Sequence, residues 1–149
     1  LFYKRFCFFF ETLFHYEKLI LTLMGNEKKR ILVIEDNEIL LSTMQFVLVR
    51  EGYDLLLAKS GKDALSLVTD ETIDLVITDL ALPFANGFEI IDCIRKSNTN
   101  NQVPVIIISG YRDDNSISEG FEVGANDYIK KPISPSELIS RVRLRIGHA

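Results

Sequence analysis

The chain of 149 residues contains little of what disulfide frameworks and metal centres are built from. Its two cysteines, Cys7 and Cys93, have no metal-ligand spacing and are too few for a disulfide framework, so we expect free thiols, as in a reducing cytoplasm. Its two histidines, His15 and His148, stand near opposite ends of the chain, and we expect both at the surface. No histidine cluster indicates a metalloenzyme.

Positive charge is also in short supply. The net charge of −4 argues against a direct nucleic-acid-binding surface, which requires a basic face. A local basic cluster comprises Arg141, Arg143 and Arg145, which we expect to solvate a last helix and to interact favourably with the negative end of its dipole. We therefore expect no direct contact with nucleic acid.

The first 23 residues are rich in phenylalanine but contain no uncharged run of 18 residues, because charged residues interrupt them at five positions. A membrane-spanning helix is therefore not expected. The apolar stretch 6–10 is too short for the core of a secretory signal peptide, and no small-residue cleavage site follows it. A helix that binds a membrane surface or a partner is the alternative, since Phe10, Leu13, Phe14 and Glu17 have helical spacing.

The remaining sequence has the length and hydrophobic fraction of one globular domain, which we place at residues 28–149. Met24 stands just before a polar segment that leads into the first apolar run. We expect residues 1–27 to be an N-terminal extension that is disordered or lies outside a natural start at Met24. The mass of the native protein would show whether residues 1–23 are made.

Short apolar runs alternate with segments of helical periodicity from Arg30 onward. The near-continuous apolar runs predict strands buried on both faces, and the segments between them predict helices, although Gly120 lowers the helix propensity of its segment. Such repeats with right-handed crossovers predict a doubly wound α/β fold, (βα)5 and flavodoxin-like, with a five-stranded parallel sheet in the order 2-1-3-4-5 and helices on both faces. The predicted strands are 31–35, 53–58, 73–79, 103–109 and 127–130, and the predicted helices are 37–50, a short helix capped by Ser60, 88–96, 113–123 and a last helix capped by Ser134.

Polar residues stand where these strands end: Glu35 and Asp36 at the first, Asp79 at the third, Ser109 at the fourth and Lys131 at the fifth. Parallel strands bring their carboxyl ends to one edge of a sheet, so three acids, a hydroxyl and an amine are expected to share one crevice. Each residue alone has an ordinary explanation as a helix cap, a turn residue or a surface charge. Their combination on one edge predicts a functional site.

Three carboxylates at one rim repel one another, by roughly 4 kcal/mol per pair at about 4 Å and an effective dielectric constant of about 20. A hard divalent cation offsets this repulsion, and Mg²⁺ prefers oxygen ligands of this kind. With the cation bound, one carboxylate can attack phosphorus, because phosphoryl transfer needs mainly in-line positioning and charge neutralisation. The residues therefore predict a Mg²⁺-dependent phosphoryl site.

Residues 29–146 resemble the response-regulator receiver domain of two-component signalling, of the chemotaxis-regulator type. The loop DLALPFANG, in which Pro83 and Gly87 follow Asp79, is similar to the family's phosphorylation loop. The segment GANDYIKKP resembles the family segment that carries an aromatic residue, a lysine and a proline. Ser109 stands between the two segments, where the family has a hydroxyl residue.

The resemblance implies a role for each acid. Asp79 is the implied phosphoacceptor. Asp36 and Asp79 are implied to bind Mg²⁺ directly, together with the backbone carbonyl of Ala81. Glu35, at a position where aspartate is commoner, is implied to contribute through water.

The resemblance also implies roles for the residues that follow the later strands. Ser109 is implied to bond the phosphoryl group, Lys131 to pair with it, and Tyr128 to be the switch aromatic whose rotamer follows Ser109. The family usually has a cis peptide at the position of Lys131-Pro132. Strand alternation directs the neighbouring Lys130 elsewhere.

A signalling domain is implied, not an enzyme, although it catalyses its own phosphorylation and dephosphorylation. The implied phosphoryl donor is a sensor histidine kinase or a phosphotransfer protein in the bacterial cytoplasm, and a downstream target docks on the face formed by residues 113–146. No membrane partner is implied. The fourth helix offers Glu119 and Glu122 where dimerising members have basic residues, so we expect a monomer or a weak dimer. Whether the chain is a stand-alone regulator or part of a longer protein stays open.

Two alternatives are a receiver fold that binds partners without phosphorylation and a haloacid-dehalogenase-type phosphatase. The intact set of acids, hydroxyl and lysine argues against the first. The second requires another acid two residues after the nucleophile, where this chain has Ala81. Ala81 and Tyr111 also flank the expected path of the attacking water and offer no group to orient it, which predicts a long-lived phosphorylated state.

Overall fold

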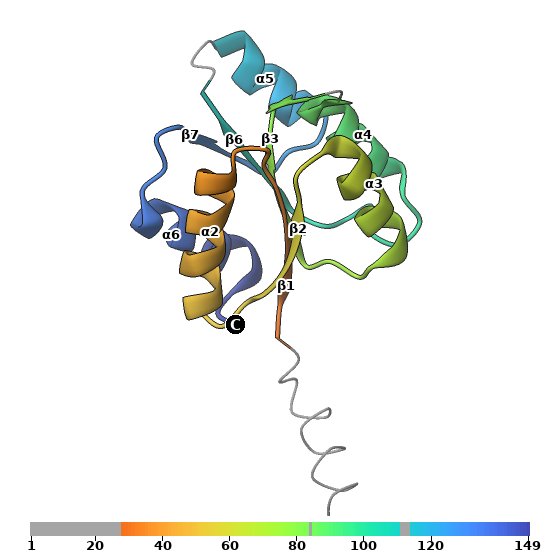
Figure 1. The fold of residues 1–149 in the computed structure, drawn as a ribbon. Helices are drawn as coiled ribbons and strands as arrows, with labels where there is room; N and C mark the ends of the chain where they lie inside the picture. Colours follow the sequence, from red (N-terminus) through yellow and green to blue (C-terminus); the bar gives the residue numbers. More distant parts are fainter. Residues whose placement is uncertain (1–27, 84, 111–113) are drawn as a thin grey trace, which may run out of the picture.

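The computed structural model describes residues 28–83, 85–110 and 114–149, with residues 85 and 114 described by their backbone alone (Figure 1). The predictions for the extension 1–27, including its cysteine, its histidine, its helical segment and the start at Met24, lie outside the described residues. The prediction for Tyr111 lies outside them as well.

Five strands form the central sheet: β1 (Arg30–Ile34), β2 (Asp54–Ala58), β3 (Leu75–Asp79), β6 (Val105–Ser109) and β7 (Asp127–Lys130). They lie in the order β2-β1-β3-β6-β7, and each neighbouring pair is parallel (Figure 1). Since β6 and β7 are the fourth and fifth strands of this sheet, the predicted order 2-1-3-4-5 is confirmed.

Helices cover both faces of the sheet (Figure 1). One face carries α2 (Glu38–Arg50) and α6 (Pro135–Ile146), and the other carries α3 (Gly61–Asp70), α4 (Gly87–Lys96) and α5 (Asp114–Glu122). Each helix follows a strand along the chain, so every connection within the sheet crosses over through a helix, as the alternating pattern predicts.

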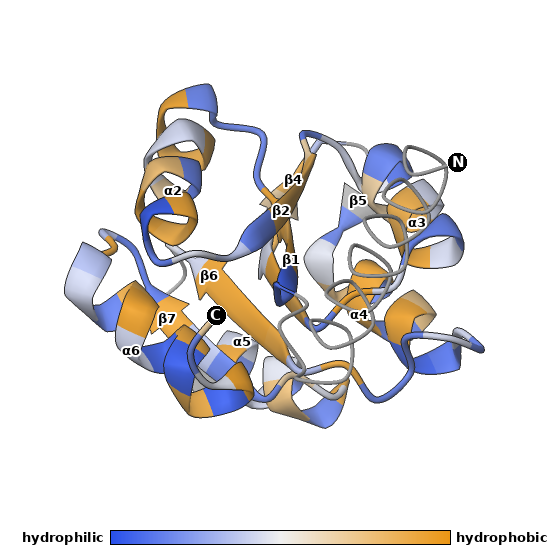
Figure 2. Ribbon diagram, turned by 90° about the horizontal axis from the view of Figure 1, so that it is seen from below, coloured by the Kyte–Doolittle hydropathy of each residue, from blue (hydrophilic) through white to orange (hydrophobic). Residues whose placement is uncertain are grey.

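Successive strand residues fill two hydrophobic cores, one on each face of the sheet. In β1, Ile31 and Val33 pack on the side of α2 and α6, whereas Leu32 and Ile34 pack on the side of α3 and α4. Both β3 and β6 are buried along their whole length, because helices cover both of their faces. Figure 2 shows β6 in hydrophobic colours, with helices of mixed hydropathy around the sheet.

Side-chain caps start the helices soon after the strands end. The Asn37 side chain accepts hydrogen bonds from the backbone of Ile39 at 3.1 Å and of Leu40 at 3.0 Å, so α2 begins close to the carboxyl end of β1. Ser60 and Ser134 each accept from the backbone three residues further on, at 3.2 Å. The caps predicted at these two serines are confirmed.

The strands differ from the predicted ones in three ways, of which the first is a shift of β1 by one residue, from the predicted 31–35 to Arg30–Ile34. Where a loop was predicted, β4 (Ala81–Leu82) and β5 (Ala85–Asn86) form an antiparallel pair, and strands of two residues are too short to show a periodic pattern. Three strands begin later than predicted, because Tyr53, Ile73 and Val103 are buried but lie ahead of the paired residues. Apolar burial therefore extends further than backbone pairing.

The arginines of α6 do more than solvate the helix, which corrects the prediction. Arg141 and Arg145 donate to the buried carboxylate of Asp127 at 3.1 and 3.0 Å, and Arg143 pairs with Glu51. Because Asp127 begins β7, two of these pairs attach α6 to the edge strand of the sheet. The partners lie on different elements, so spacing along the sequence did not show them.

Two surface predictions are confirmed: Cys93 is a free, exposed thiol and His148 is exposed. Within the described part of the chain, no helix combines the length and the apolar character needed to cross a bilayer.

Candidate functional site

Three acids meet at the carboxyl edge of the sheet. Glu35 and Asp36 follow β1, and Asp79 ends the neighbouring β3. One carboxylate oxygen of each residue lies within 4.8 Å of the others. Glu35 and Asp79 are buried, whereas Asp36 is exposed to solvent. The predicted gathering of these acids is therefore confirmed.

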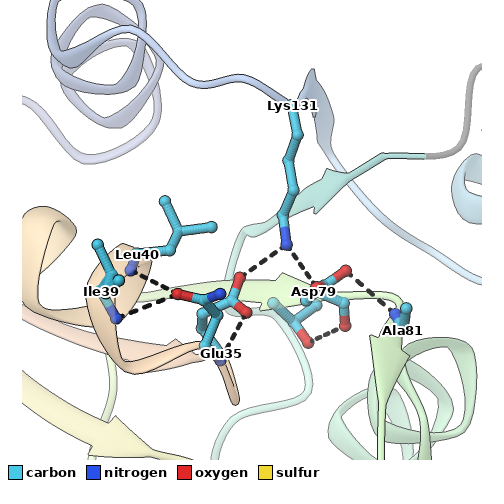
Figure 3. Close-up of polar contacts among 8 residues, drawn as sticks. Glu35, Ile39, Leu40, Asp79, Ala81 and Lys131 are labelled. Atoms are coloured by element: carbon cyan, nitrogen blue, oxygen red, sulfur yellow. Dashed lines mark hydrogen bonds and ion pairs between the residues drawn. The ribbon is translucent and has the colours of Figure 1, made fainter.

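Lys131 bridges two of these acids, Glu35 and Asp79 (Figure 3). Its Nζ donates to Asp79 Oδ2 at 2.6 Å and to Glu35 Oε2 at 2.9 Å. Lys130 is exposed, as strand alternation predicts, and the Lys131-Pro132 peptide bond is cis, as the resemblance implied. The fold thus aims one of two adjacent lysines at the acids.

The pKa values at this edge reflect burial and pairing. Burial raises the pKa of Glu35, against the opposing effect of the hydrogen bonds from Lys131 and from the backbone of Asn37. Burial alone would lower the pKa of Lys131, but its hydrogen bonds to Asp79 and Glu35 outweigh burial and raise it. Lys131 therefore stays an ammonium group at neutral pH.

Charge at this edge is not balanced among the described residues. Three carboxyl groups lie together, and the ion pairs described for them all involve the single ammonium of Lys131. Such an excess of clustered oxygen ligands fits a hard divalent cation, which prefers carboxylate and carbonyl oxygens. The donor set is thus suited to Mg²⁺ and poorly suited to a soft metal.

The backbone around Asp79 is held in place from both sides. Asp79 Oδ1 accepts from the Ala81 backbone at 3.0 Å, and the buried Thr78 hydroxyl donates to the Asp79 carbonyl at 2.9 Å. A Cβ at Gly87 would collide with that same carbonyl and with the backbone of Leu80. Gly87 therefore lets α4 start directly against the acidic strand end. The sequence marked Gly87 by its motif, but nothing in the pattern indicated Thr78.

Ser109 and Tyr128 lie on the two strands beyond β3. Ser109 ends β6 and is fully buried, and its carbonyl accepts from the Lys131 backbone at 2.9 Å. Ile107 pairs in register with Tyr128 of β7. By alternation Ser109 shares the sheet face of Ile107, and Tyr128 packs on that face too. The structure thus places the hydroxyl and the aromatic ring on one side of adjacent strands, under α5.

A doubly wound α/β domain with clustered acids and a lysine at the carboxyl edge of its sheet is the class that these observations define. The family model of the response regulator receiver domain matches residues 31–143. The chain therefore belongs to the response-regulator receiver family.

Known proteins similar to this chain agree with the assignment. The DNA-binding response regulator MtrA of Mycobacterium tuberculosis (strain H37Rv) is 38% identical over 123 residues, which are 83% of this chain and 53% of MtrA. The transcriptional regulatory protein AfsQ1 of Streptomyces coelicolor is 34% identical over 113 residues, 76% of this chain and 49% of AfsQ1. The chain thus spans about half the length of the curated relatives it matches.

A solved structure with the same fold comes from Pseudomonas aeruginosa. The receiver domain of the sensor histidine kinase PA1611, determined with a magnesium ion coordinated in its active site cleft, has a TM-score of 0.75 and 26% identity, and the match covers 81% of this chain and 99% of that domain. The doubly wound, flavodoxin-like fold and the receiver function are thereby confirmed, and the phosphatase alternative is not favoured.

Proposed function

We propose that Asp79 accepts a phosphoryl group from the phosphohistidine of a sensor histidine kinase or a phosphotransfer protein. The observation that carries this proposal is the Lys131 ammonium, which contacts Asp79 at 2.6 Å and Glu35 at 2.9 Å beside a cluster of three acids. An ammonium at that place neutralises charge on the oxygens of an incoming phosphoryl group. A buried carboxylate with such a neighbour is a suitable nucleophile toward phosphorus.

Mg²⁺ is the proposed cofactor. Asp36 and Asp79 would bind it directly with the carbonyl of Ala81, and Glu35 would contribute through water; the clustered carboxylate oxygens of the three acids support this assignment. The magnesium ion in the cleft of the PA1611 receiver domain is a further support. When bound, the metal neutralises negative charge on the phosphoryl oxygens.

The reaction forms one bond and breaks one. A carboxylate oxygen of Asp79 attacks phosphorus in line, the bond from phosphorus to the imidazole nitrogen breaks, and the nitrogen takes the electron pair. Lys131 turns from the carboxylate to a phosphoryl oxygen, and the Ala81 backbone N–H, which already donates to Asp79, holds the carboxylate in orientation. The chain thus catalyses its own phosphorylation, and later its own dephosphorylation.

The phosphorylated site is proposed to act as a switch. The Ser109 hydroxyl bonds the new phosphoryl group, and Tyr128 reorients on the same side of the sheet. The face formed by α5, β7 and α6 then changes its affinity for a downstream target. Such a site shifts an existing equilibrium between two conformations.

We propose that the partners of this domain are proteins. MtrA is described as DNA-binding, but the net charge of −4 gives this chain no basic excess for nucleic acid, so we propose that this domain does not contact nucleic acid or a membrane. We propose a monomer or weak dimer in the cytoplasm, with a domain at residues 28–149 and the extension 1–27 outside it.

Labelling with acetyl phosphate tests the assignment of Asp79. With Mg²⁺ present, the wild-type protein becomes labelled and Asp79→Asn does not, because the amide is not a nucleophile. Asp92→Asn, which alters an exposed acid paired with Lys96 on α4, serves as the control and keeps its label. Undiminished labelling of Asp79→Asn would contradict the proposal.

Titration with Mg²⁺ and beryllofluoride, followed by NMR, separates the rival functions. A phosphoacceptor binds both and shifts the resonances of Ser109 and Tyr128. A binding module without phosphorylation responds to neither. A phosphatase additionally releases inorganic phosphate from added phosphomonoesters over many turnovers.

A further inference from the structure

The guanidinium of Arg95, in the last turn of α4, donates five hydrogen bonds to neutral oxygens. Its Nε and Nη2 donate to the Gly124 carbonyl at 3.1 and 2.7 Å, and its Nη1 donates to the carbonyls of Asn101 and Val103 at 3.1 and 2.7 Å. Its Nη2 also reaches the Asn126 side chain at 3.0 Å. One side chain therefore ties α4 to the segment before β6 and to the turn before β7.

The charge of Arg95 lies at the carboxyl ends of two helices. Arg95 belongs to the last turn of α4, and Gly124 closes α5 with a φ of +106°. Around that turn the Gly124 backbone donates to Phe121 at 3.1 Å and the Ala125 backbone donates to Gly120 at 3.0 Å. Helix carboxyl ends carry partial negative charge, so one cation stabilises both ends together.

The contacts of Arg95 lock the amino ends of β6 and β7 together. The Asn126 side chain that Arg95 holds also accepts from the Val105 backbone at 2.8 Å, and the Asn126 backbone donates to the Val105 carbonyl at 2.8 Å. The carboxyl ends of the same two strands lead to Ser109 and Lys131. The amino end of this strand pair is therefore fixed, and its carboxyl end leads to Ser109 and Lys131, which lie beside Asp79 of β3 in the proposed phosphorylation site.

α5 lies between the amino and the carboxyl ends of β6 and β7. A Cβ at Gly120 would lie 2.7 Å from the Cδ1 methyl of Ile107 and 3.9 Å from the Tyr128 ring, so α5 lies close to both β6 and β7 at this residue. Because of this proximity, movement of the Tyr128 ring would displace α5 directly. α5 can respond by tilting or by shifting as a whole. Which of the two occurs depends on how firmly the contacts of Arg95 hold the carboxyl end of the helix.

We propose that Arg95 is a positioning residue that fixes the carboxyl end of α5, so that reorientation of Tyr128 tilts the amino end of the helix. Without the contacts of Arg95, the 124–126 turn rearranges when Tyr128 moves. The amino end of α5 then tilts less, and the partner-binding face changes less. The proposal rests on the proposed phosphorylation switch and adds the pivot about which the switch moves.

Beryllofluoride titration of Arg95→Met, followed by NMR, tests the pivot. Because Arg95 lies at the opposite edge from Asp79, the half-saturating concentrations of Mg²⁺ and beryllofluoride are expected to stay within about twofold of wild type. The beryllofluoride-induced shift of the Gly120 amide falls to less than about half, and hydrogen exchange at Gly124 and Ala125 rises roughly tenfold. Lys96→Met, which alters the next residue and its exposed pair with Asp92, behaves as wild type.

A second variant, Gly124→Ala, disrupts the contact between Arg95 and the 124–126 turn by changing the turn instead of the arginine. A Cβ at Gly124 would lie 2.9 Å from Arg95 Nε at a strained φ, so Gly124→Ala displaces the guanidinium while leaving every charge in place. It is expected to reproduce the loss of the Gly120 shift, and the double variant is expected to add little to either single one. If Arg95→Met fails to fold, Gly124→Ala carries the test.

The outcomes are distinguishable. A full Gly120 shift in both variants would overturn the pivot while leaving the proposed function in place. No response of the wild-type protein to beryllofluoride would overturn both the switch and the pivot. Wild-type affinity together with a reduced shift supports the pivot, because damage to folding alone would also weaken the binding of Mg²⁺.

Discussion

At the amino edge of the sheet, ion pairs join one acid to one base: Lys29 lies 3.2 Å from Asp74, and Arg30 lies 2.7 Å from Glu71. At the carboxyl edge, three acids cluster together, and among the described residues their ion pairs are those of Glu35 and Asp79 with Lys131. A third acid at the amino edge, Asp127, has two basic partners, Arg141 and Arg145. The ion-paired acids described at the amino edge thus each have at least one base, whereas at the carboxyl edge the acids outnumber their base. Matched pairs are explained by folding alone, whereas excess charge implies a ligand that the structure is built to receive.

Burial strengthens this contrast. The side chains of Glu35 and Asp79 are 1% and 6% exposed, whereas those of Lys29 and Asp74 are 44% and 35% exposed. Water screens the amino-edge pairs and lowers their contribution to the free energy of unfolding, whereas the charges of the buried carboxylates are screened much less. Changes at the carboxyl edge should therefore have larger effects than matched changes at the amino edge, and they should respond to Mg²⁺.

The largest effect on stability is expected for Lys131→Met. The change leaves Glu35 and Asp79 buried without their ammonium, and we expect the free energy of unfolding to fall by about 3 kcal/mol without Mg²⁺. Saturating Mg²⁺ should restore much of the loss, because the cation replaces the missing charge. Urea denaturation with and without Mg²⁺ measures both. Lys130→Met, at the exposed neighbour, is the control, and a loss that Mg²⁺ leaves unchanged would count against excess acid as its cause.

The next effect concerns Mg²⁺ itself. For a single site, a ligand at about 100 times its Kd raises the free energy of unfolding by about 2.7 kcal/mol. We expect this gain in the wild-type protein and a much smaller gain at the same Mg²⁺ concentration in Asp36→Asn. Calorimetric melting at increasing Mg²⁺ gives the comparison, with Asp92→Asn as the control. Equal stabilisation of Asp36→Asn would remove Asp36 from the ligand set.

A smaller effect is expected from pH. Burial raises the pKa of Glu35 above its ordinary value of 4.5, so the folded state holds this proton more tightly than the unfolded chain does. Stability without Mg²⁺ should then fall as the pH rises from 4.5 through the raised value. Glu35→Gln cannot ionise, so its unfolding free energy should lose this decline in urea titrations across the range.

Glu38 provides the control of opposite sign. The hydrogen bond from Lys59 lowers the pKa of this exposed acid, so its contribution is present above the ordinary pKa and disappears as the pH falls. Glu38→Gln should therefore keep the decline that Glu35 causes. A decline that persists in Glu35→Gln would assign it to another group.

The sequence predicted the carboxyl edge better than the amino edge, for a physical reason. Glu35, Asp79 and Lys131 could be placed together because they follow strands, and parallel strands bring their ends to one edge. Arg95 and Asn126 could not, because their contacts depend on side-chain reach between loops, for which a sequence has no periodic signal. The ion pairs of Asp127 with Arg141 and Arg145 of α6 could not be predicted for the same reason.

The sequence also indicated only part of the role of Gly120. The sequence marked Gly120 as a weakness in its helix, but the structure shows that a Cβ there would lie 2.7 Å from the Cδ1 methyl of Ile107, so the missing Cβ leaves that methyl undisturbed beneath α5. Propensity describes a residue within its own helix and contains no information about the neighbouring sheet. The strand order, by contrast, followed from chain-wide alternation and the handedness of crossovers, which hold whatever the side-chain detail.

The smallest effect is expected at the amino edge, from Lys29→Met. Both side chains of its pair with Asp74 are more than one third exposed, so the change should lower the free energy of unfolding by no more than about 1 kcal/mol. Asp74 retains the hydrogen bond from the Arg30 backbone at 2.8 Å, which leaves its carboxylate partnered after the lysine is removed. Mg²⁺ should not alter the loss, and urea denaturation beside Lys131→Met measures this. A loss as large as that of Lys131→Met would mean that the two edges differ in geometry but not in charge balance, and the inference from excess acid to a bound cation would lose its basis.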